Sequence, residues 1–183
     1  LIFGSKITFY AFLFAPIVLV MIISSKINSL SANMASFLFF VYSAVTGVTL
    51  SAIFLVYTQD SIATTFGITA GTFGATALFG YVTKKDLSKM GSILFMLLIG
   101  LIIASVVNMF LKSDTMMWVL TYAGIVIFVG LTAYDMQKLK KIAHSIDEDE
   151  SSIAKFAVLG ALTLYLDFIN LFLRLLQIFG KKR

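Results

Sequence analysis

Two aspartates, Asp135 and Asp167, are the residues whose type and position most strongly indicate chemistry. Each lies inside a long apolar run, whereas the other seven acids lie in polar connections. An ionisable group at membrane depth costs at least about 2.5–3.5 kcal/mol, so it usually faces a protein interior or a water-filled cavity. Two carboxyls that meet there cannot both ionise cheaply, so they share a proton and titrate as a unit. The pair is therefore predicted to act as a pH-sensitive latch between two helices.

Asp167 belongs to a narrow polar stripe on its predicted helix. Positions spaced alternately three and four apart share one helix face. From Asp167, that face reads Gly160, Thr163, Asp167, Asn170, Arg174 and Gln177. Leucine, isoleucine and phenylalanine cover the other faces. Such a stripe should face the interior of a helix bundle, which predicts a central last helix with Asn170 and Arg174 shielded from lipid.

The preceding apolar run carries a milder stripe that ends at Asp135. Its members are Thr121, Gly124, Phe128, Thr132 and Asp135. The polar stripe that is expected to support the two acids consists of Thr132, Thr163, Asn170 and Arg174. Two structural alternatives stay open. Asp167 could pair with Arg174 on its own helix, and Asp135 could be a surface acid near Lys138 at the end of its run.

The composition indicates that the bilayer is the solvent. Of 183 residues, 60% are hydrophobic and 13% charged, and the mean hydropathy is +0.99. Soluble domains have about 45–50% apolar and about 25% charged residues. The net charge of +5 is spread between apolar runs, which argues against nucleic acid as a partner. The chain has no cysteine and no HExxH motif, so neither a metal site nor a cofactor is predicted.

Six runs are long enough to be membrane spans, since about 20 apolar residues cross the hydrocarbon. They cover approximately 7–24, 34–57, 61–82, 90–111, 116–137 and 155–179. The predicted fold is an all-α polytopic helix bundle that forms a single transmembrane domain over residues 1–183. Lysines are most frequent in alternate loops, which predicts that loops 83–89 and 138–155 are cytoplasmic.

Three details of this arrangement are predicted as well. Small residues at Gly67, Gly71 and Ala75 favour close helix packing. The acidic run at 147–150 is interpreted as a solvated loop rather than a calcium site, because it lacks the spaced ligands of an EF-hand. Measured as helix rise, Asp135 lies about 9 Å before Lys141, and Asp167 lies about 18 Å after Lys155. The two depths match only if the fifth helix continues past Lys141 or the sixth begins late.

At these residues the sequence resembles a known family. The segments "GLTAYDMQKLK" (130–140) and "LGALTLYLDFINLFLRLLQIFG" (159–180) closely resemble the Bax inhibitor-1 family, also called the transmembrane Bax inhibitor motif proteins. The segments "TGVTLSAIF" (46–54) and "KKDLSKMGSILFM" (84–96) are similar to its bacterial branch. The resemblance covers nearly the whole chain.

The resemblance implies a seven-helix bundle with a central last helix, in a bacterial cytoplasmic (inner) membrane. It implies a di-aspartyl pH sensor at Asp135 and Asp167 and a pH-sensitive leak for calcium, which would be bound weakly. Two departures matter. Six spans are found, which suggests that the family's first helix is absent. The helix before the "GVTL" segment also carries no arginine near its start, and Lys26 is the nearest cation.

Two other functions are weighed against the leak. An intramembrane aspartyl protease would have "YD" on one helix and "GxGD" on the next, but here "LYLD" (164–167) replaces the second motif. No enzyme is therefore predicted. The other alternative is a non-conducting protein that regulates a quality-control protease or other membrane machinery through a membrane-protein partner. Ion flux through purified protein in liposomes separates this alternative from a leak.

Overall fold

The computed structural model describes residues 6–145 and 149–183, with side chains from residue 15 onward. Within these residues the chain is helical apart from short connections and one isolated β-bridge. It divides into two compact units, which are described separately. One comprises residues 1–56 and 145–162, and the other comprises residues 57–144 and 163–183.

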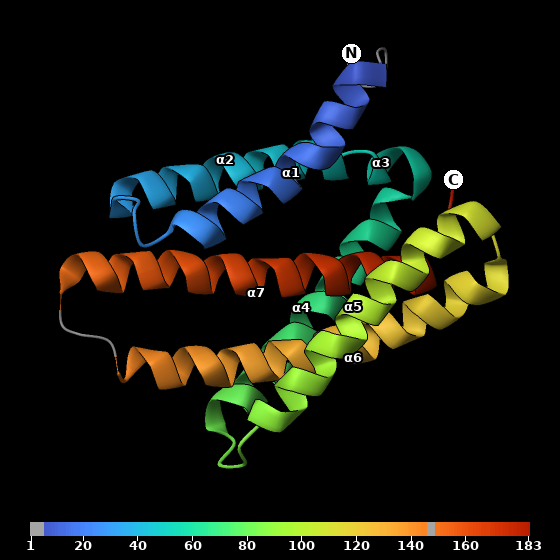
Figure 1. Cartoon of the computed structure of the whole chain (residues 1–183). Coiled ribbons are helices and arrows are strands. Elements are labelled where there is room, and N and C mark those ends of the chain that lie inside the picture. Colours follow the sequence, from blue (N-terminus) through green and yellow to red (C-terminus); the bar gives the residue numbers. More distant parts are fainter. Residues whose placement is uncertain (1–5, 146–148) are drawn as a thin grey trace. The chain divides into compact units, whose positions relative to one another are not determined.

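The first unit is built on a helix hairpin. Helices α1 (Lys6–Lys26) and α2 (Ala32–Leu50) pack against each other and run in opposite directions (Figure 1). Ser31 caps the start of α2, because its hydroxyl accepts a hydrogen bond from the Met34 backbone N–H at 3.2 Å. The first part of α7 (Glu150–Phe179) also belongs to this unit, where the Lys155 ammonium donates to the Asn28 carbonyl at 3.3 Å.

The second predicted span, 34–57, is not one continuous helix. It breaks after α2 at residues 51–52 and resumes as the short α3 (Ile53–Val56). At the break, the Ser51 hydroxyl donates to the Val48 carbonyl at 2.6 Å, while its N–H is shared between the carbonyls of Gly47 and Val48. Serine side chains compete for backbone groups in this way and weaken a helix interior. The predicted span itself agrees with the structure, since Ala32–Val56 is long and apolar enough to cross a bilayer, although its helix is interrupted.

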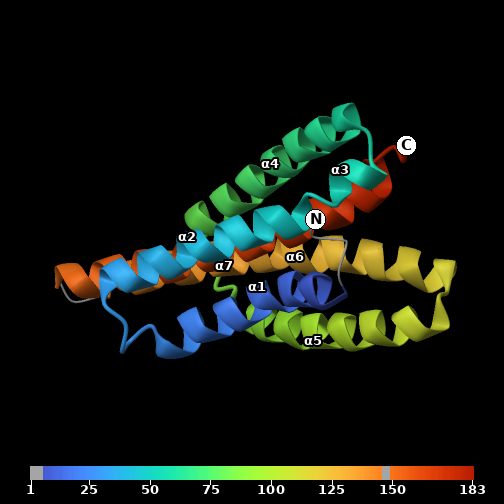
Figure 2. The same cartoon turned by 90° about the horizontal axis from the view of Figure 1, so that it is seen from above.

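The second unit consists of α4 (Gln59–Val82), α5 (Ser88–Leu111), α6 (Asp114–Ala143) and the end of α7. Helix α6 packs against both α4 and α5, and its course beside α5 is visible in Figure 2. The core is made by leucines, an isoleucine and a phenylalanine of three helices: Leu94, Leu101, Leu120, Ile127, Phe128, Leu131, Leu171 and Leu175. Edge-to-face ring contacts of Phe168 with Phe66 and Phe73 join α7 to α4.

The end of α6 agrees with one of the two predicted alternatives. Helix α6 continues past Lys141 to Ala143, but α7 already begins at Glu150 instead of late. Asp135 then lies about 12 Å of helix rise before the end of α6, and Asp167 about 25 Å after the start of α7. The six connecting residues, 144–149, are long enough to join helix ends at different depths.

The acidic run lies partly outside the described residues. Asp147 and Glu148 are not covered, whereas Asp149 and Glu150 are exposed. Asp149 accepts hydrogen bonds from the backbone N–H and the hydroxyl of Ser152, both at 3.0 Å. Its carboxylate therefore satisfies a free N–H in the first turn of α7, which favours the solvated-loop interpretation for these two residues.

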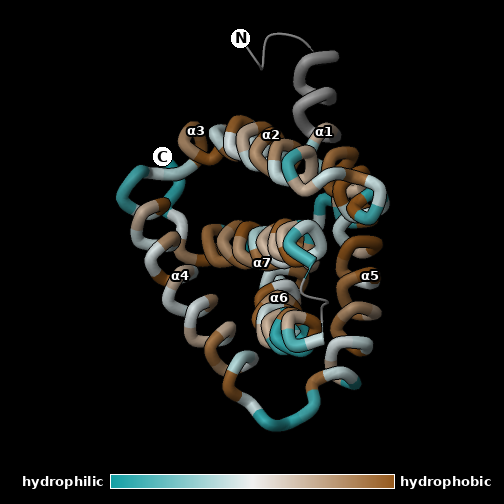
Figure 3. Tube along the Cα trace, turned by 90° about the vertical axis from the view of Figure 1, so that its left-hand side faces the viewer, coloured by the Kyte–Doolittle hydropathy of each residue, from teal (hydrophilic) through white to brown (hydrophobic). Residues whose placement is uncertain are grey.

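Length and hydropathy identify a polytopic membrane protein. Among the described residues, five segments are long and apolar enough to cross a bilayer: Ala32–Val56, Gln59–Val82, Ser88–Leu111, Asp114–Ala143 and Glu150–Phe179. Figure 3 shows apolar residues along the helices and hydrophilic residues at the α4–α5 connection. For α1, the described apolar part, Ala15–Lys26, is shorter, so its span stays a prediction, as does the single-domain organisation.

Candidate functional site

The second unit brings Asp135 of α6 and Asp167 of α7 together. Their carboxyl groups lie within hydrogen-bonding reach of each other. Asp167 is only 5% exposed, and its Oδ2 has no hydrogen-bond partner among the described residues. Asp135 is half-buried. The predicted meeting of the two acids is thus found, whereas their role as a pH sensor stays a prediction.

Both carboxyls line a cavity of about 950 Å³ in the second unit. Apolar residues of α5, among them Phe95, Leu98 and Met109, make much of its wall. Helices α6 and α7 contribute its charged and amide groups, which are Asp135, Lys138, Asp167, Asn170 and Arg174. The polar residues of α7 from Thr163 to Arg174 therefore face a partly open cavity that is lined by α5, α6 and α7.

The supporting residues of the two stripes occupy different positions. Thr163, Asn170 and Arg174 line the cavity. Thr132 is fully buried, and its hydroxyl donates to the Phe128 carbonyl of its own helix at 2.8 Å, so it does not line the cavity. The Asn170 amide likewise donates within its own helix, to the Leu166 carbonyl at 2.8 Å.

Gln177, the last member of the α7 stripe, does not line the cavity and contacts α6 instead. Its side chain is exposed, yet its Oε1 accepts a hydrogen bond from the Thr121 hydroxyl of α6 at 2.6 Å. This bond joins the two helices away from the paired acids. It shows that the two sequence stripes do face each other, because one member of each is in direct contact.

Both structural alternatives for the acids disagree with this geometry. Arg174 forms no ion pair with Asp167 in the described part of the chain, where the one ion pair joins Lys141 and Asp86. The Arg174 side chain instead lies against Gly124 of α6. Asp135 is half-buried on the cavity wall, whereas a surface acid would be exposed.

Comparisons with known proteins agree with this architecture. The family described as "Inhibitor of apoptosis-promoting Bax1" matches residues 1–183. The chain is 55% identical to the inner membrane protein YbhL of Escherichia coli strain K12 over 184 residues, covering 100% of this chain and 79% of YbhL. It is also 50% identical to an uncharacterized protein of Borreliella burgdorferi, covering 100% and 79% of the two chains. With the protein RP147 of Rickettsia prowazekii, it shares 45% identity over 93% of this chain and 72% of the relative.

The chain belongs to the Bax inhibitor-1 family. Together with its long apolar helices, its similarity to an inner membrane protein makes it a multi-pass protein of the bacterial inner membrane. In this family member, the paired acids lie on the two helices whose motifs, "AYD" (133–135) and "YLDFINLF" (165–172), carried the resemblance.

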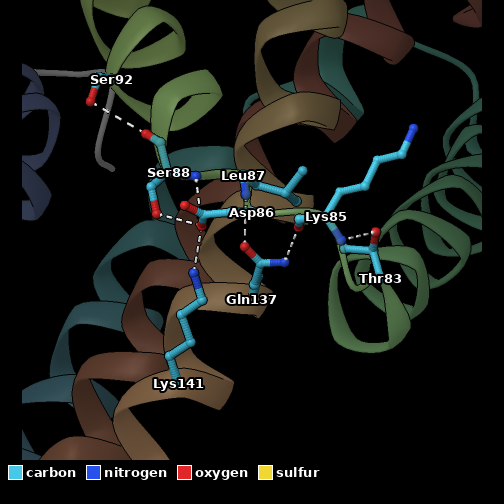
Figure 4. A network of polar contacts seen from close by, with 8 residues as sticks. All are labelled: Thr83, Lys85, Asp86, Leu87, Ser88, Ser92, Gln137 and Lys141. Carbon is cyan, nitrogen blue, oxygen red and sulfur yellow. Dashed lines mark hydrogen bonds and ion pairs between the residues drawn. The ribbon is translucent and has the colours of Figure 1, made fainter.

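A second polar cluster in this Bax inhibitor-1 protein was not predicted. It fixes the α4–α5 connection to the last turns of α6 (Figure 4). The Gln137 side chain accepts from the Leu87 N–H at 2.9 Å and donates to the Lys85 carbonyl at 2.8 Å. The Lys141 ammonium contacts Asp86 Oδ1 at 2.6 Å. We call these contacts the loop clamp. They place residues 83–87 and the end of α6 at the same end of this unit, as the alternation of loops requires.

The ion pair in the loop clamp has an electrostatic consequence. Hydrogen bonds from Lys141 and then from Ser88 lower the pKa of Asp86 from 3.8 to about 2. A nearby ammonium favours the ionised carboxylate, which explains this direction. Both side chains are largely exposed, so water and salt weaken the interaction.

Two glycines let neighbouring helices approach α6 just before the loop clamp. A Cβ at Gly80 of α4 would collide with the Ala133 carbonyl oxygen, and a Cβ at Gly91 of α5 would collide with the Tyr134 ring. By contrast, a Cβ at Gly67 or Gly71 would meet nothing within 4 Å. The predicted close packing at Gly67 and Gly71 is therefore wrong, and it occurs at other glycines.

Proposed function

We propose that this protein is a pH-sensitive leak for calcium in the inner membrane, with Asp135 and Asp167 as a proton-sharing gate. The observation that supports the proposal is the meeting of two carboxyls from different helices on the wall of a cavity in a membrane protein. In this proposal the chain is not an enzyme, and calcium is a transported, weakly bound ion.

The electrostatics of the pair give it two states. With one shared proton, a hydrogen bond joins α6 to α7. Without that proton, two like charges face each other in surroundings of low dielectric constant and push the helices apart. Carboxylate oxygens are also the ligands that Ca²⁺ prefers, but two carboxyls are few compared with the six to eight oxygens of a tight site. Such a pair therefore suits a passing ion better than a stored one.

The test is calcium flux into liposomes that contain the purified protein, measured across pH. Asp135→Asn and Asp167→Asn each remove the like-charge repulsion, so each should flatten the pH dependence of the flux. The double variant should add little, because the two residues act as one unit. Asp114→Asn is the matched control, since Asp114 is an exposed acid at the opposite end of α6 from Asp135.

Two results would contradict the proposal. If both single variants keep the pH profile of the unaltered protein, the pair is not the sensor. If the unaltered protein conducts no calcium at any pH, the leak itself is wrong, and the alternative of a non-conducting regulator with a membrane-protein partner is favoured. Two neighbouring carboxyls would also suit an aspartyl protease, but "LYLD" (164–167) lacks the glycines of that family's second motif.

A further inference from the structure

Another charged group of the cavity, the Arg174 guanidinium, has no partner among the residues that the structure describes. Arg174 is half-buried and lines the same space as Asp135 and Asp167. Among the described residues it has neither an ion pair nor a hydrogen bond, although a buried charge is costly unless it is paired. Arginine stays charged in proteins, so this positive charge is a fixed feature of the cavity.

The neighbouring helix leaves room for this side chain at Gly124. A Cβ on Gly124 would lie 3.0 Å from Nε, 3.2 Å from Cδ and 3.3 Å from Cγ of Arg174. The aliphatic stem and the start of the guanidinium group therefore cross α6 where it has no side chain. The stem of Arg174 thus lies against α6, and in the described part of the chain no ion pair fixes its charged end.

The position of Arg174 along the cavity matters for a moving ion. It lies seven residues beyond Asp167, which is about 10.5 Å of helix rise toward the end of α7. The other cavity cation, Lys138, is exposed and lies three residues after Asp135, beside the paired acids. Toward one end of the cavity, the charged lining residues are thus Lys138 and the two acids. Toward the other end, Arg174 is the charged lining residue. An ion that leaves the acids toward Arg174 meets an unneutralised positive charge.

We propose that Arg174 is a selectivity-determining residue, whose charge sets an electrostatic barrier to cations in this cavity. The inference rests on the proposed leak and adds a barrier separate from the paired acids. Coulomb energy is proportional to the charge of the ion, so the barrier is twice as high for Ca²⁺ as for K⁺. If removal of the charge raises the K⁺ flux by a given factor, it should therefore raise the Ca²⁺ flux by the square of that factor.

The experiment compares Ca²⁺ and K⁺ flux into liposomes for the unaltered protein, Arg174→Gln and Arg174→Lys. Arg174→Gln should raise K⁺ flux about threefold and Ca²⁺ flux about tenfold, on the order of the effect of one partly screened charge. Arg174→Lys keeps the charge and should keep the ratio of Ca²⁺ to K⁺ flux. Because both ions are measured on one preparation, this ratio does not depend on how much protein is folded.

Lys181→Gln is the matched control. Lys181 is an exposed cation just beyond the end of α7 and outside the cavity, so its loss should leave the flux ratio unchanged. An equal increase for both ions in Arg174→Gln would mean that a smaller side chain merely widens the path, which overturns the inference. An unchanged ratio in Arg174→Gln also overturns it, although the leak stands. The absence of flux in every variant removes the leak and this inference together.

Discussion

Two neighbouring segments that carry the paired acids differ in how their polar groups are used. In α6, residues 133–141 are fixed by close backbone approach at Gly80 and by the hydrogen bonds of Gln137. In α7, the polar residues of the stripe line the cavity, where Asp167 Oδ2 and the Arg174 guanidinium have no hydrogen-bond partner in the described part of the chain. Gln137 and Lys141 of the first segment are bonded to the α4–α5 connection, whereas Asp167 Oδ2 and the Arg174 guanidinium of the second segment have no such partner among the described residues.

This difference separates residues that hold the fold from residues that the proposed leak would use. Satisfied buried hydrogen bonds and close packing make a segment rigid, and losing them costs stability. Unsatisfied groups contribute little to stability, and in a native protein each calls for an explanation. Substitutions at the contacts of α6 with α4 and with the α4–α5 connection should therefore change stability most. Under the proposed function, substitutions of the polar residues that line the cavity should change ion flux most.

The largest effect on stability is expected for Gly80→Ala. The added Cβ would collide with the Ala133 carbonyl oxygen, a backbone atom that cannot rotate away. Overpacking of this kind costs about 1–3 kcal/mol, and a backbone collision belongs at the upper end of that range. Thermal unfolding of the detergent-purified protein should show a clear decrease in Tm.

Gly74→Ala on the same helix is the matched control for Gly80→Ala. A Cβ at Gly74 meets nothing within 4 Å. Alanine is the better helix former by about 0.8–1 kcal/mol, so this variant should be as stable as the unaltered protein or slightly more stable. Equal Tm values for the two variants would show that close approach to α6 does not hold this segment.

A smaller loss of stability is expected for Gln137→Leu. This variant leaves the N–H of Leu87, a buried residue, and the Lys85 carbonyl without their side-chain partner. An unsatisfied buried group costs about 1–3 kcal/mol. Asn170→Leu should cost less, because the Asn170 amide bonds only to its own helix. If Asn170→Leu lowers the Tm more than Gln137→Leu does, the contrast between the segments is wrong.

The sequence predicted the features that depend on local periodicity. The spacing of Thr163, Asp167, Asn170 and Arg174 places them on one face of any α-helix, and the cost of acids in lipid directs that face inward. That physical reasoning required no knowledge of the neighbouring helices. The meeting of the two acids was a separate hypothesis, because it also depends on which helices become neighbours.

Other features depend on which helices become neighbours, and the sequence could not give them. Gly67 and Gly71 have the spacing typical of close packing, yet the glycines in close contact with α6 are Gly80 and Gly91. Gln137 lies in a polar helix end, where the sequence pattern distinguishes no hydrophilic residue from another. Its role follows only from the course of the α4–α5 connection, since its two partners are backbone groups about 50 residues away along the chain.

The smallest effect on stability is expected for Asp86→Asn, at the exposed edge of the loop clamp. Because the folded state lowers the pKa of Asp86 from 3.8 to about 2, the carboxylate stabilises the fold fully above its ordinary pKa. That contribution is lost as the pH falls through the folded value. Around neutral pH the charge of Asp86 does not change, so Asp86→Asn should leave the pH profile of calcium flux as it is.

The measurement is unfolding of the unaltered protein and Asp86→Asn over an acid pH series. Asp86→Asn should be slightly less stable than the unaltered protein above the ordinary pKa, and the difference should vanish as the pH approaches the folded value of about 2. In about 1 M salt, where charges are screened beyond about 3 Å, the difference should shrink, since Lys141 and Asp86 are both largely exposed. A difference that grows as the pH falls would contradict the ion pair. An altered pH profile of flux would show that the loop clamp, and not only the paired acids, senses protons.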